Sequence, residues 1–452
     1  MDPILLAACI SMSLTGCMLG VFSGIVPGIH VNTLAAMLLA ACPAIWDALP
    51  LDRSASAAAV ACCVMSASVV HSFVDFVPSV FIGAPDSEDA VSVLPGHRLL
   101  LKGRGMEAVR AAAIGSLVGC SAAVLLAVPL QWLLLHGAAD ILSGATPAVL
   151  GAATMIVLAN EMRRGTGAWG PLLFALSGIL GLGCMTLPIP ATGMLGDGNV
   201  MMPLLTGLFG IPVMLEASGA GKMPSQKDRT KDPVGIAPGL KGVLMGTVAG
   251  WFPGITSTVG ASISSVMFPA KSPERFISTV ASIGSVTSVL SLVTLSVSGN
   301  GRSGTALVIG ELAGEGLAGA ASPMFLLLLL SAAVGSAAGY GLTIACGRWM
   351  SKAVSRIDQD SLNRTVLILL LALTLALSGP AGMLVLMAST AVGMVPGRAG
   401  TGRMVLCGCL ILPVLLFKTG IARAWSGPWR GTSRCRRRTS RGHRTRSRPR
   451  HP

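Results

Sequence analysis

The stretch Gly16-Cys-Met-Leu-Gly20-Val-Phe-Ser-Gly24-Ile-Val-Pro27-Gly28-Ile29 recurs without a gap as Gly242-Val-Leu-Met-Gly246-Thr-Val-Ala-Gly250-Trp-Phe-Pro253-Gly254-Ile255. Glycines four residues apart lie on one face of a helix and allow a second helix to pack closely. A proline then removes a backbone donor and stops the helix from continuing normally. The offset of 226 residues therefore predicts two related helices that break at equivalent points in the two halves of the chain.

The composition places these helices in a membrane. The chain is 52% hydrophobic and only 12% charged, whereas a soluble domain carries about 25% charged residues. Apolar runs recur along the whole chain, as in a helical membrane bundle. We expect an all-α, polytopic membrane bundle of two structural repeats, with helices broken at Pro-Gly, re-entrant pieces and about 10–12 membrane segments. The first run, from Leu5 to Val26, is expected to be a retained membrane helix rather than a signal peptide.

Polar segments divide the chain into four parts. We predict a first transmembrane repeat at 1–216, a polar linker at 217–241, a second repeat at 242–420 and a basic disordered tail at 421–452. Ten of the charges in the net +14 come from arginines from Arg430 onward, which leaves +4 for the remainder. The tail is expected to be an unstructured topogenic segment or one attracted to anionic lipid. No nucleic-acid partner is expected.

The residues after each break are candidates for a binding site. Freed backbone groups at membrane depth are tolerated only within protein or beside a water-filled cavity, so a repeated break indicates a transporter's binding site. Polar residues follow both breaks and would begin helices whose positive ends suit an anion. The alternative is two kinked packing helices without a ligand. The candidate substrate-binding residues here are Pro27, Gly28, His30, Asn32, Thr33, Pro253, Gly254, Thr256 and Thr258.

A second polar interruption follows in each half. The first half has Gly83-Ala-Pro-Asp86-Ser87-Glu88-Asp89, and the second has Ser298-Gly-Asn300-Gly-Arg302-Ser-Gly-Thr305. Asp86, Ser87, Glu88 and Asn300 are the candidates for binding a coupling cation, and Arg302 could bind a carboxylate through two hydrogen bonds. The alternative is a pair of water-exposed loops.

One histidine and one aspartate lie four residues apart inside an apolar run. His71 and Asp75 would share a helix face, and we interpret them as a buried polar pair near a translocation path rather than as metal ligands. The 11 cysteines form no Cys-x-x-Cys pair, so we expect neither a metal site nor a cofactor.

The motifs around the breaks resemble those of a known family. Ser23–His30, the run from Gly83 to His97, Lys102–Gly105 and Gly250–Ile255 are similar to the permease subunit of the tripartite tricarboxylate transporter family, especially its archaeal-type members. The similarity covers about residues 10–395. The resemblance implies a small membrane subunit and an extracytoplasmic solute-binding protein as partners.

We therefore predict a multi-pass secondary transporter of the cell membrane. Its expected substrate is a small organic anion, a carboxylate, and Na⁺ or H⁺ is expected to drive transport. The chain is not expected to be an enzyme. The rival interpretations are an intramembrane enzyme acting on a lipid or peptide, and a membrane scaffold that transports nothing.

Overall fold

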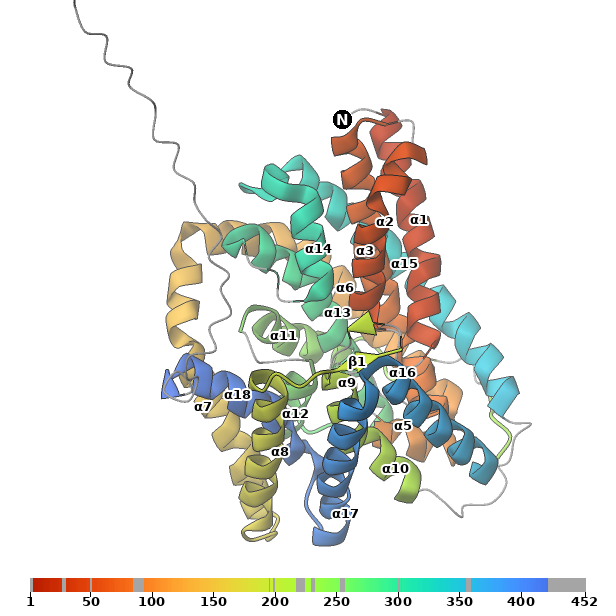
Figure 1. Cartoon of the computed structure of the whole chain (residues 1–452), viewed down its shortest axis with the longest axis vertical. Helices are drawn as coiled ribbons and strands as arrows, with labels where there is room; N and C mark the ends of the chain where they lie inside the picture. The colour runs from red at the N-terminus through yellow and green to blue at the C-terminus, as the bar shows by residue number, and fades with distance from the viewer. Residues whose placement is uncertain are drawn as a thin grey trace, which may run out of the picture.

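The structure is a computed structural model that describes residues 3–26, 30–48, 51–83, 93–194, 196–197, 200–216, 224–228, 232–252, 257–299, 301, 303–354 and 359–421. Both Pro-Gly elements, the acidic segment at 84–92 and the tail beyond 421 lie outside these ranges. The described residues are almost entirely helical (Figure 1). The predicted all-α fold class is thus confirmed.

The described part of the first half contains ten α-helices, two π-helical turns and one short hairpin. These are α1 (Pro3–Ile25), α2 (Val31–Ala48), α3 (Arg53–Val74), α4 (Phe76–Phe81), α5 (Val93–Leu100), α6 (Gly105–Leu133), η2 (Leu134–Ala138), α7 (Ala139–Arg163), α8 (Trp169–Thr186), β1 (Thr192–Gly193), β2 (Gly196–Asp197), α9 (Met201–Leu205), η3 (Thr206–Gly210) and α10 (Ile211–Glu216). The sequence did not indicate the antiparallel hairpin.

The second half begins after the polar linker. Its elements are α11 (Ala237–Trp251), α12 (Ser257–Met267), α13 (Pro273–Ser298), α14 (Gly304–Ala313), η4 (Gly314–Leu317), α15 (Pro323–Val354), α16 (Gln359–Gly393), α17 (Val395–Ala399), η5 (Arg403–Cys407) and α18 (Gly408–Lys418). Helices therefore end before each Pro-Gly and begin again after it, at Ile25 and Val31 in the first half and at Trp251 and Ser257 in the second.

Seven helical stretches of the described chain are long and apolar enough to cross a membrane. They are Pro3–Ile25, Arg53–Phe81, Gly105–Arg163, Trp169–Thr186, Pro273–Ser298, Pro323–Val354 and Arg364–Ala399. The 59-residue stretch bends at Gly137, whose φ of 105° is open to glycine but not to most residues. Val31–Pro43 and Met201–Gly210 are apolar but shorter, as expected for half-length segments.

The repeated glycines bring two pairs of helices into close contact. In α1, Cβ atoms at Gly16 and Gly20 would overlap or crowd the backbone of α3 at Cys63 and Ala67. In α11, Gly242 and Gly246 meet α13 in the same way, at Ser282 and Val286. Only glycine permits this approach. The glycine pattern of the sequence thus correctly indicated the packing face of each helix.

The order of these contacts fixes the relative directions of the helices. Gly16 lies at Cys63 and Gly24 at Val74, so α1 and α3 run parallel; Gly335 at Ser66 and Gly339 at Phe73 make α15 parallel to them. We call α1, α3 and α15 the α3 bundle. By the same reasoning α6, α11 and α13 run parallel and form the α13 bundle, since Gly115 lies at Ser278 and Gln131 bonds Ser296.

The two bundles run in opposite directions. Gly347 of α15 lies against Val109 of α6, while Ala321, before α15, donates its N–H to Gln131 near the end of α6. Helices α6 and α15 are therefore antiparallel. Each bundle takes two helices from one half of the chain and one from the other, so the two glycine-laddered pairs are inverted relative to each other.

The remaining helices pack outside the two bundles. In Figure 1, α7, α8 and α18 form a group in the lower left, and α16 and α17 lie below α1 and α3. Helix α16 bends at Gly379, where β1 approaches so closely that a Cβ would overlap the Thr192 carbonyl oxygen. Buried Glu161 at the end of α7 accepts the N–H of Gly402 at 3.1 Å and so fixes the loop before η5.

Candidate functional site

The first break places one side chain against the second half of the chain. His30 precedes α2, and its Nδ1 accepts the N–H of Asn32 at 3.1 Å. The side-chain oxygen of Asn32 in turn accepts the N–H of Thr305, in the first turn of α14, at 3.0 Å. A Cβ on Gly304 would lie 2.8 Å from that of Asn32, so glycine is needed there. The start of α2, which follows the first Pro-Gly, thus contacts the start of α14 in the second half of the chain.

The N-terminus of α14 is capped from both sides of this junction. Besides the bond from Thr305 to Asn32, the N–H of Ala306 is accepted by the Ser303 hydroxyl at 3.1 Å. The Ser303 and Thr305 hydroxyls lie 2.9 Å apart. Because unpaired amides of a first helical turn attract anions, side-chain oxygens occupy here the place that an anion's oxygen would take.

Two histidines meet next to this junction. His71 on α3 is buried, and its Nδ1 lies 3.0 Å from the hydroxyl of Ser23 on α1. The His30 ring lies 5.2 Å from the His71 ring, centroid to centroid. Asp75 is buried one turn further along the same helix. We call Ser23, His30, His71 and Asp75 the histidine cluster. The structure confirms that His71 and Asp75 are buried and adds the two partners on α1 and before α2.

A cavity of about 330 Å³ lies beside the second interruption. Its walls come from the end of α13, from α14 and from η4, and four of its lining residues are glycines: Gly299, Gly301, Gly310 and Gly314. Ser296 and Glu311 supply the polar side chains. We call it the glycine-lined cavity. Its volume lies at the lower end of the range for small-molecule sites.

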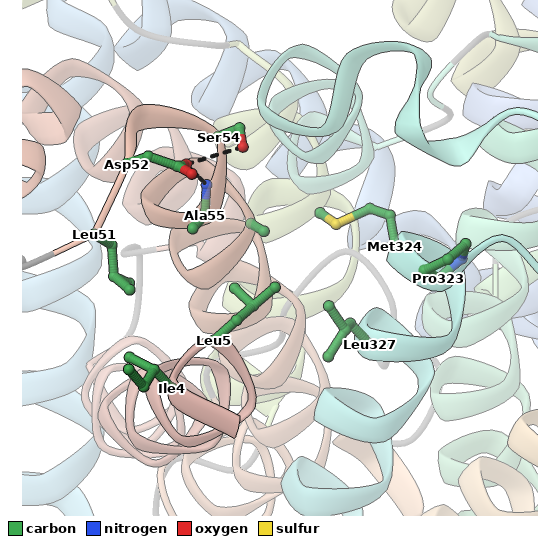
Figure 2. A pocket seen from close by; sticks show the side chains of 10 residues that line it. Ile4, Leu5, Leu51, Asp52, Ser54, Ala55, Pro323, Met324 and Leu327 are labelled. Atoms are coloured by element: carbon green, nitrogen blue, oxygen red, sulfur yellow. Dashed lines mark hydrogen bonds between the residues drawn. The ribbon is translucent and has the colours of Figure 1, made fainter. Parts of the chain in front are cut away.

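A larger cavity of about 530 Å³ opens where α1, α3 and α15 begin (Figure 2). Ile4, Leu5, Met324 and Leu327 give it apolar walls. Its one acidic side chain, Asp52, accepts the N–H of Ala55 at 2.8 Å and thereby caps α3. This carboxylate therefore has a structural role, and the cavity lies at the ends of the helices rather than at their breaks.

The opposite end of the α3 bundle carries a charged cluster. Arg104 bonds Glu107 of α6 at 3.0 Å and Glu274 of α13 at 2.6 Å. Asp228 of the linker bonds Arg110 of α6 at 2.6 Å and Arg348 of α15 at 2.9 Å. The Arg110 guanidinium, followed by that of Arg348, holds the pKa of Asp228 below its usual range. These ion pairs hold Asp228 of the linker against α6 and α15.

No pattern in the sequence predicted this charged cluster. Glu107 and Glu274 lie in the first turns of their helices and are almost fully buried. A usable signal was present, because acidic residues inside apolar helices face protein rather than lipid. No local pattern indicates that Arg104 pairs with both carboxylates, because Arg104 lies 170 residues from Glu274.

Of the other predicted site residues, Thr33 is exposed on α2 beside Asn32 and Thr258 is fully buried in α12. Helix α12 packs against α11 and α13, whereas α2 packs against α3 and α14. The remaining predicted residues lie outside the described part of the chain: Pro27, Gly28, Pro253, Gly254, Thr256, Arg302, Asp86, Ser87, Glu88 and Asn300.

A polytopic helical fold with apolar spans and paired helix breaks is typical of integral membrane proteins of the transporter class. The profile of the tripartite tricarboxylate transporter TctA family matches residues 10–408, and the chain belongs to this family. It is therefore a multi-pass membrane permease and not an enzyme, so the enzyme interpretation was wrong.

The comparison with individual proteins adds one relative. An uncharacterized protein of Methanocaldococcus jannaschii is 28% identical over 300 residues, which cover 65% of this chain and 70% of that protein. This similarity agrees with the resemblance to archaeal-type members. No solved structure matches the chain.

Proposed function

We propose that this permease is a secondary transporter of the cell membrane that moves a small carboxylate, driven by a gradient of Na⁺ or H⁺. The observation that supports the proposal most is the bond between Asn32 and Thr305. It joins the first break to the interruption of the other half, next to the glycine-lined cavity. In transporters built from inverted repeats, substrates bind where broken helices of the two repeats meet.

The chemistry of the junction favours an anion. The Asn32 side-chain oxygen accepts the Thr305 N–H, and a substrate carboxylate could take its place there while the Asn32 amide donates to the substrate. Glycine walls leave backbone groups accessible to a small polar solute. His30 and Thr33, and outside the described residues Pro27, Gly28 and Arg302, complete the proposed substrate site on this side.

The second break would contribute the other wall of the site. Thr258 is the second residue of α12 and corresponds to Asn32, the second residue of α2, 226 residues earlier. Pro253, Gly254 and Thr256 precede it and remain predicted substrate residues. Asp86, Ser87, Glu88 and Asn300 remain the predicted cation-coupling residues. The repeat boundaries at 216 and 242, and the disorder of the tail, likewise remain predictions.

The charged cluster supports a cytoplasmic position for the linker. The segments with Arg104 and Arg110, with Lys227 and with Arg348 meet at one end of the bundles. Basic loops are retained in the cytoplasm. We therefore place the larger cavity, at the opposite end, on the extracytoplasmic side. There it faces the compartment in which a solute-binding protein would deliver substrate; this partner and a small membrane subunit are implied by the family's tripartite description.

Uptake by proteoliposomes tests the proposal. The purified full chain is reconstituted, and counterflow of radiolabelled citrate, tricarballylate, succinate, malate and glutarate is measured with each acid inside and outside. We expect counterflow of at least one acid. A second set of vesicles contains the small subunit and binding protein from neighbouring genes. Absence of counterflow for every acid in both sets, with protein that is folded by its melting curve, would overturn the proposed function.

A further inference from the structure

The histidine cluster is unusual for its position. Helices α1 and α4 contain no charged residue, and on α3 the charged residues are Arg53 at its start and Asp75 just past its end. His71 and Asp75 nevertheless lie among buried apolar residues of α3, at 5% exposure each. Ionisable side chains at such positions in membrane proteins are costly and are retained for function. The mechanism proposed above does not use His71 or Asp75.

The hydrogen bonds around His71 favour one tautomer of its ring. The Ser23 hydroxyl lies 3.0 Å from His71 Nδ1 and 3.2 Å from the Gly20 carbonyl oxygen. Both contacts are satisfied when Nδ1–H donates to the hydroxyl and the hydroxyl donates to Gly20. In this tautomer, Nε2 of His71 is the atom that takes up a proton. Histidine is also the side chain that changes its charge most readily near neutral pH.

Protonation of His30 would act directly on the junction. Its Nδ1 accepts the Asn32 N–H, and an imidazolium has no acceptor nitrogen. A proton on Nδ1 therefore breaks this bond and frees the first turn of α2. Asn32 lies in that turn and holds Thr305 of α14. The charge state of His30 is thus linked through two hydrogen bonds to the capping of α14.

The two rings would share one proton rather than hold two. Their centroids lie 5.2 Å apart, and a positive charge on one ring disfavours a second positive charge on the other. Asp75 lies one turn from His71 and is also buried. A single proton can then pass between the α3 side and the α2 side of the cluster.

We propose that His30 and His71, with Asp75 beside them, bind the coupling ion, and that this ion is H⁺. The inference rests on the proposed transport function and selects between its two possible coupling ions. The proton binds an imidazole nitrogen on one side of the membrane and leaves the same nitrogen on the other, so no redox partner or covalent step is needed.

The charges on neighbouring helices lie near helix ends. On the helices that contact α3 these are Asp47 on α2, Glu107 and Arg110 on α6, Glu274 and Arg275 on α13, Glu311 on α14, and Arg348 and Lys352 on α15. The thiols of Cys17 and Cys346 pack with Val70 and Val74, one from α1 and one from α15. In the middle of these helices, within the described residues, the other titratable side chains are Tyr340 of α15 and further cysteines.

The test compares exchange with accumulation in proteoliposomes. Counterflow of the acid found above needs no net proton movement and reports a folded substrate site. Accumulation is driven by a pH gradient of one unit, alkaline inside, without Na⁺ and with the membrane potential clamped at zero. One coupled proton then supports about tenfold accumulation. His71→Gln is compared with His136→Gln, since His136 is exposed at the bend between α6 and α7 and bonds the Trp132 carbonyl oxygen four residues before it.

We expect the wild type and His136→Gln to accumulate the acid about tenfold. We expect His71→Gln to retain counterflow within about twofold and to lose accumulation. His71→Gln that still accumulates normally overturns the proposal, as does wild-type accumulation driven by a Na⁺ gradient alone. If His71→Gln loses counterflow as well, the wild-type gradients decide: accumulation driven by the pH gradient without Na⁺ supports the proposal, and accumulation that needs a Na⁺ gradient overturns it. Absence of counterflow in the wild type overturns the transport function and this inference together, whereas counterflow without pH-driven accumulation overturns this inference alone.

Discussion

Asn32 connects parts of the chain that lie 273 residues apart. Its backbone N–H donates to His30 Nδ1 at the start of α2, and its side-chain oxygen accepts the N–H of Thr305 at the start of α14. A side-chain cap of this kind contributes about 1 kcal/mol to stability. Its larger effect would be on transport, because α2, which contains Asn32, and α14, which Asn32 caps, both border the proposed substrate site.

We expect Asn32→Ala to lower the free energy of unfolding by about 1 kcal/mol and to abolish most counterflow. Asn32→Asp keeps an acceptor for Thr305 and should retain the stability, while its negative charge should weaken the binding of a carboxylate. Melting curves in detergent and counterflow rates measure the two effects. Asn160→Ala on α7 is the matched control and should behave as the wild type; an Asn32→Ala variant with full counterflow would contradict the proposed site.

The ion pairs of Asp228 predict how stability depends on pH. The pKa of Asp228 is lowered in the folded state, first by Arg110 and then by Arg348. The stabilisation is therefore complete above the usual aspartate pKa and is lost as the pH falls through the lower folded value, below about pH 4. The carboxylate is about one-third exposed, so we expect no more than about 1 kcal/mol.

Asp228→Asn should accordingly lower the Tm by about 1–2 °C at pH 6, and the difference from the wild type should shrink toward pH 3. Differential scanning fluorimetry across this range measures it. Asp140→Asn, at an exposed position in the first turn of α7, provides the control. A difference that stays constant with pH would show that the ion pairs are not its source.

At the scale of single residues, the sequence predicted where polar groups matter but not what they touch. His30, Asn32 and the pair of His71 and Asp75 stood out because polar residues are rare in apolar runs. Their partners Ser23 and Thr305 did not stand out, because serine and threonine occur throughout the membrane helices, where many bond only their own helix. Such contacts depend on which helices become neighbours, and no local pattern encodes that.

At the scale of helices, the glycine ladders give a direct test of the packing. A Cβ at Gly20 would lie 2.6 Å from the Ala67 carbonyl oxygen, and one at Gly246 would lie 2.6 Å from the Val286 Cβ. We expect Gly20→Ala and Gly246→Ala each to reduce stability by about 1–3 kcal/mol. At Gly151 in α7 a Cβ would meet nothing within 4 Å, so Gly151→Ala should be neutral or stabilising by about 0.5–1 kcal/mol.

Melting temperatures of the three alanine variants in one detergent measure these effects. The comparison is internally controlled, because all three changes add one methyl group to a helical glycine. Equal melting temperatures for Gly20→Ala and Gly151→Ala would contradict the close contact between α1 and α3.

The limits of helix prediction lie at the irregular elements. The Pro-Gly breaks were predicted because proline and glycine mark them in the sequence. The bend of α16 at Gly379 also precedes a proline, but its role became visible only when β1 was found against it. The two-residue strands leave no alternating pattern that could be detected in a sequence.

At the scale of the whole molecule, each half of the chain lends one helix to the other. Helix α6 packs on α13, and α15 packs on α3. We expect residues 1–220 or 221–452 expressed alone to be degraded, because each half leaves a face of α3 or α13 uncovered. The two halves expressed together should assemble and retain counterflow. Immunoblots of membranes and transport assays measure this.

A chain truncated after Ile421 is the control for this experiment and should accumulate as the full chain does, because the basic tail is predicted to be disordered. Stable, separately purified halves would contradict the exchange of α6 and α15. The sequence predicted the duplication from its 226-residue offset. It could not predict the opposite directions, because an offset compares residues and carries no information on how the two copies face each other.

The exchange of α6 and α15 also determines which parts can move as rigid bodies. A cut at the linker separates the two halves of the sequence, but it does not separate the α3 bundle from the α13 bundle. Any rocking that exposes the substrate site first to one side and then to the other must occur between the α3 bundle and the α13 bundle, along the antiparallel seam of α6 and α15. Distance labels should therefore be placed one on α1 and one on α11, because labels on α3 and α15, though from different halves, would travel together.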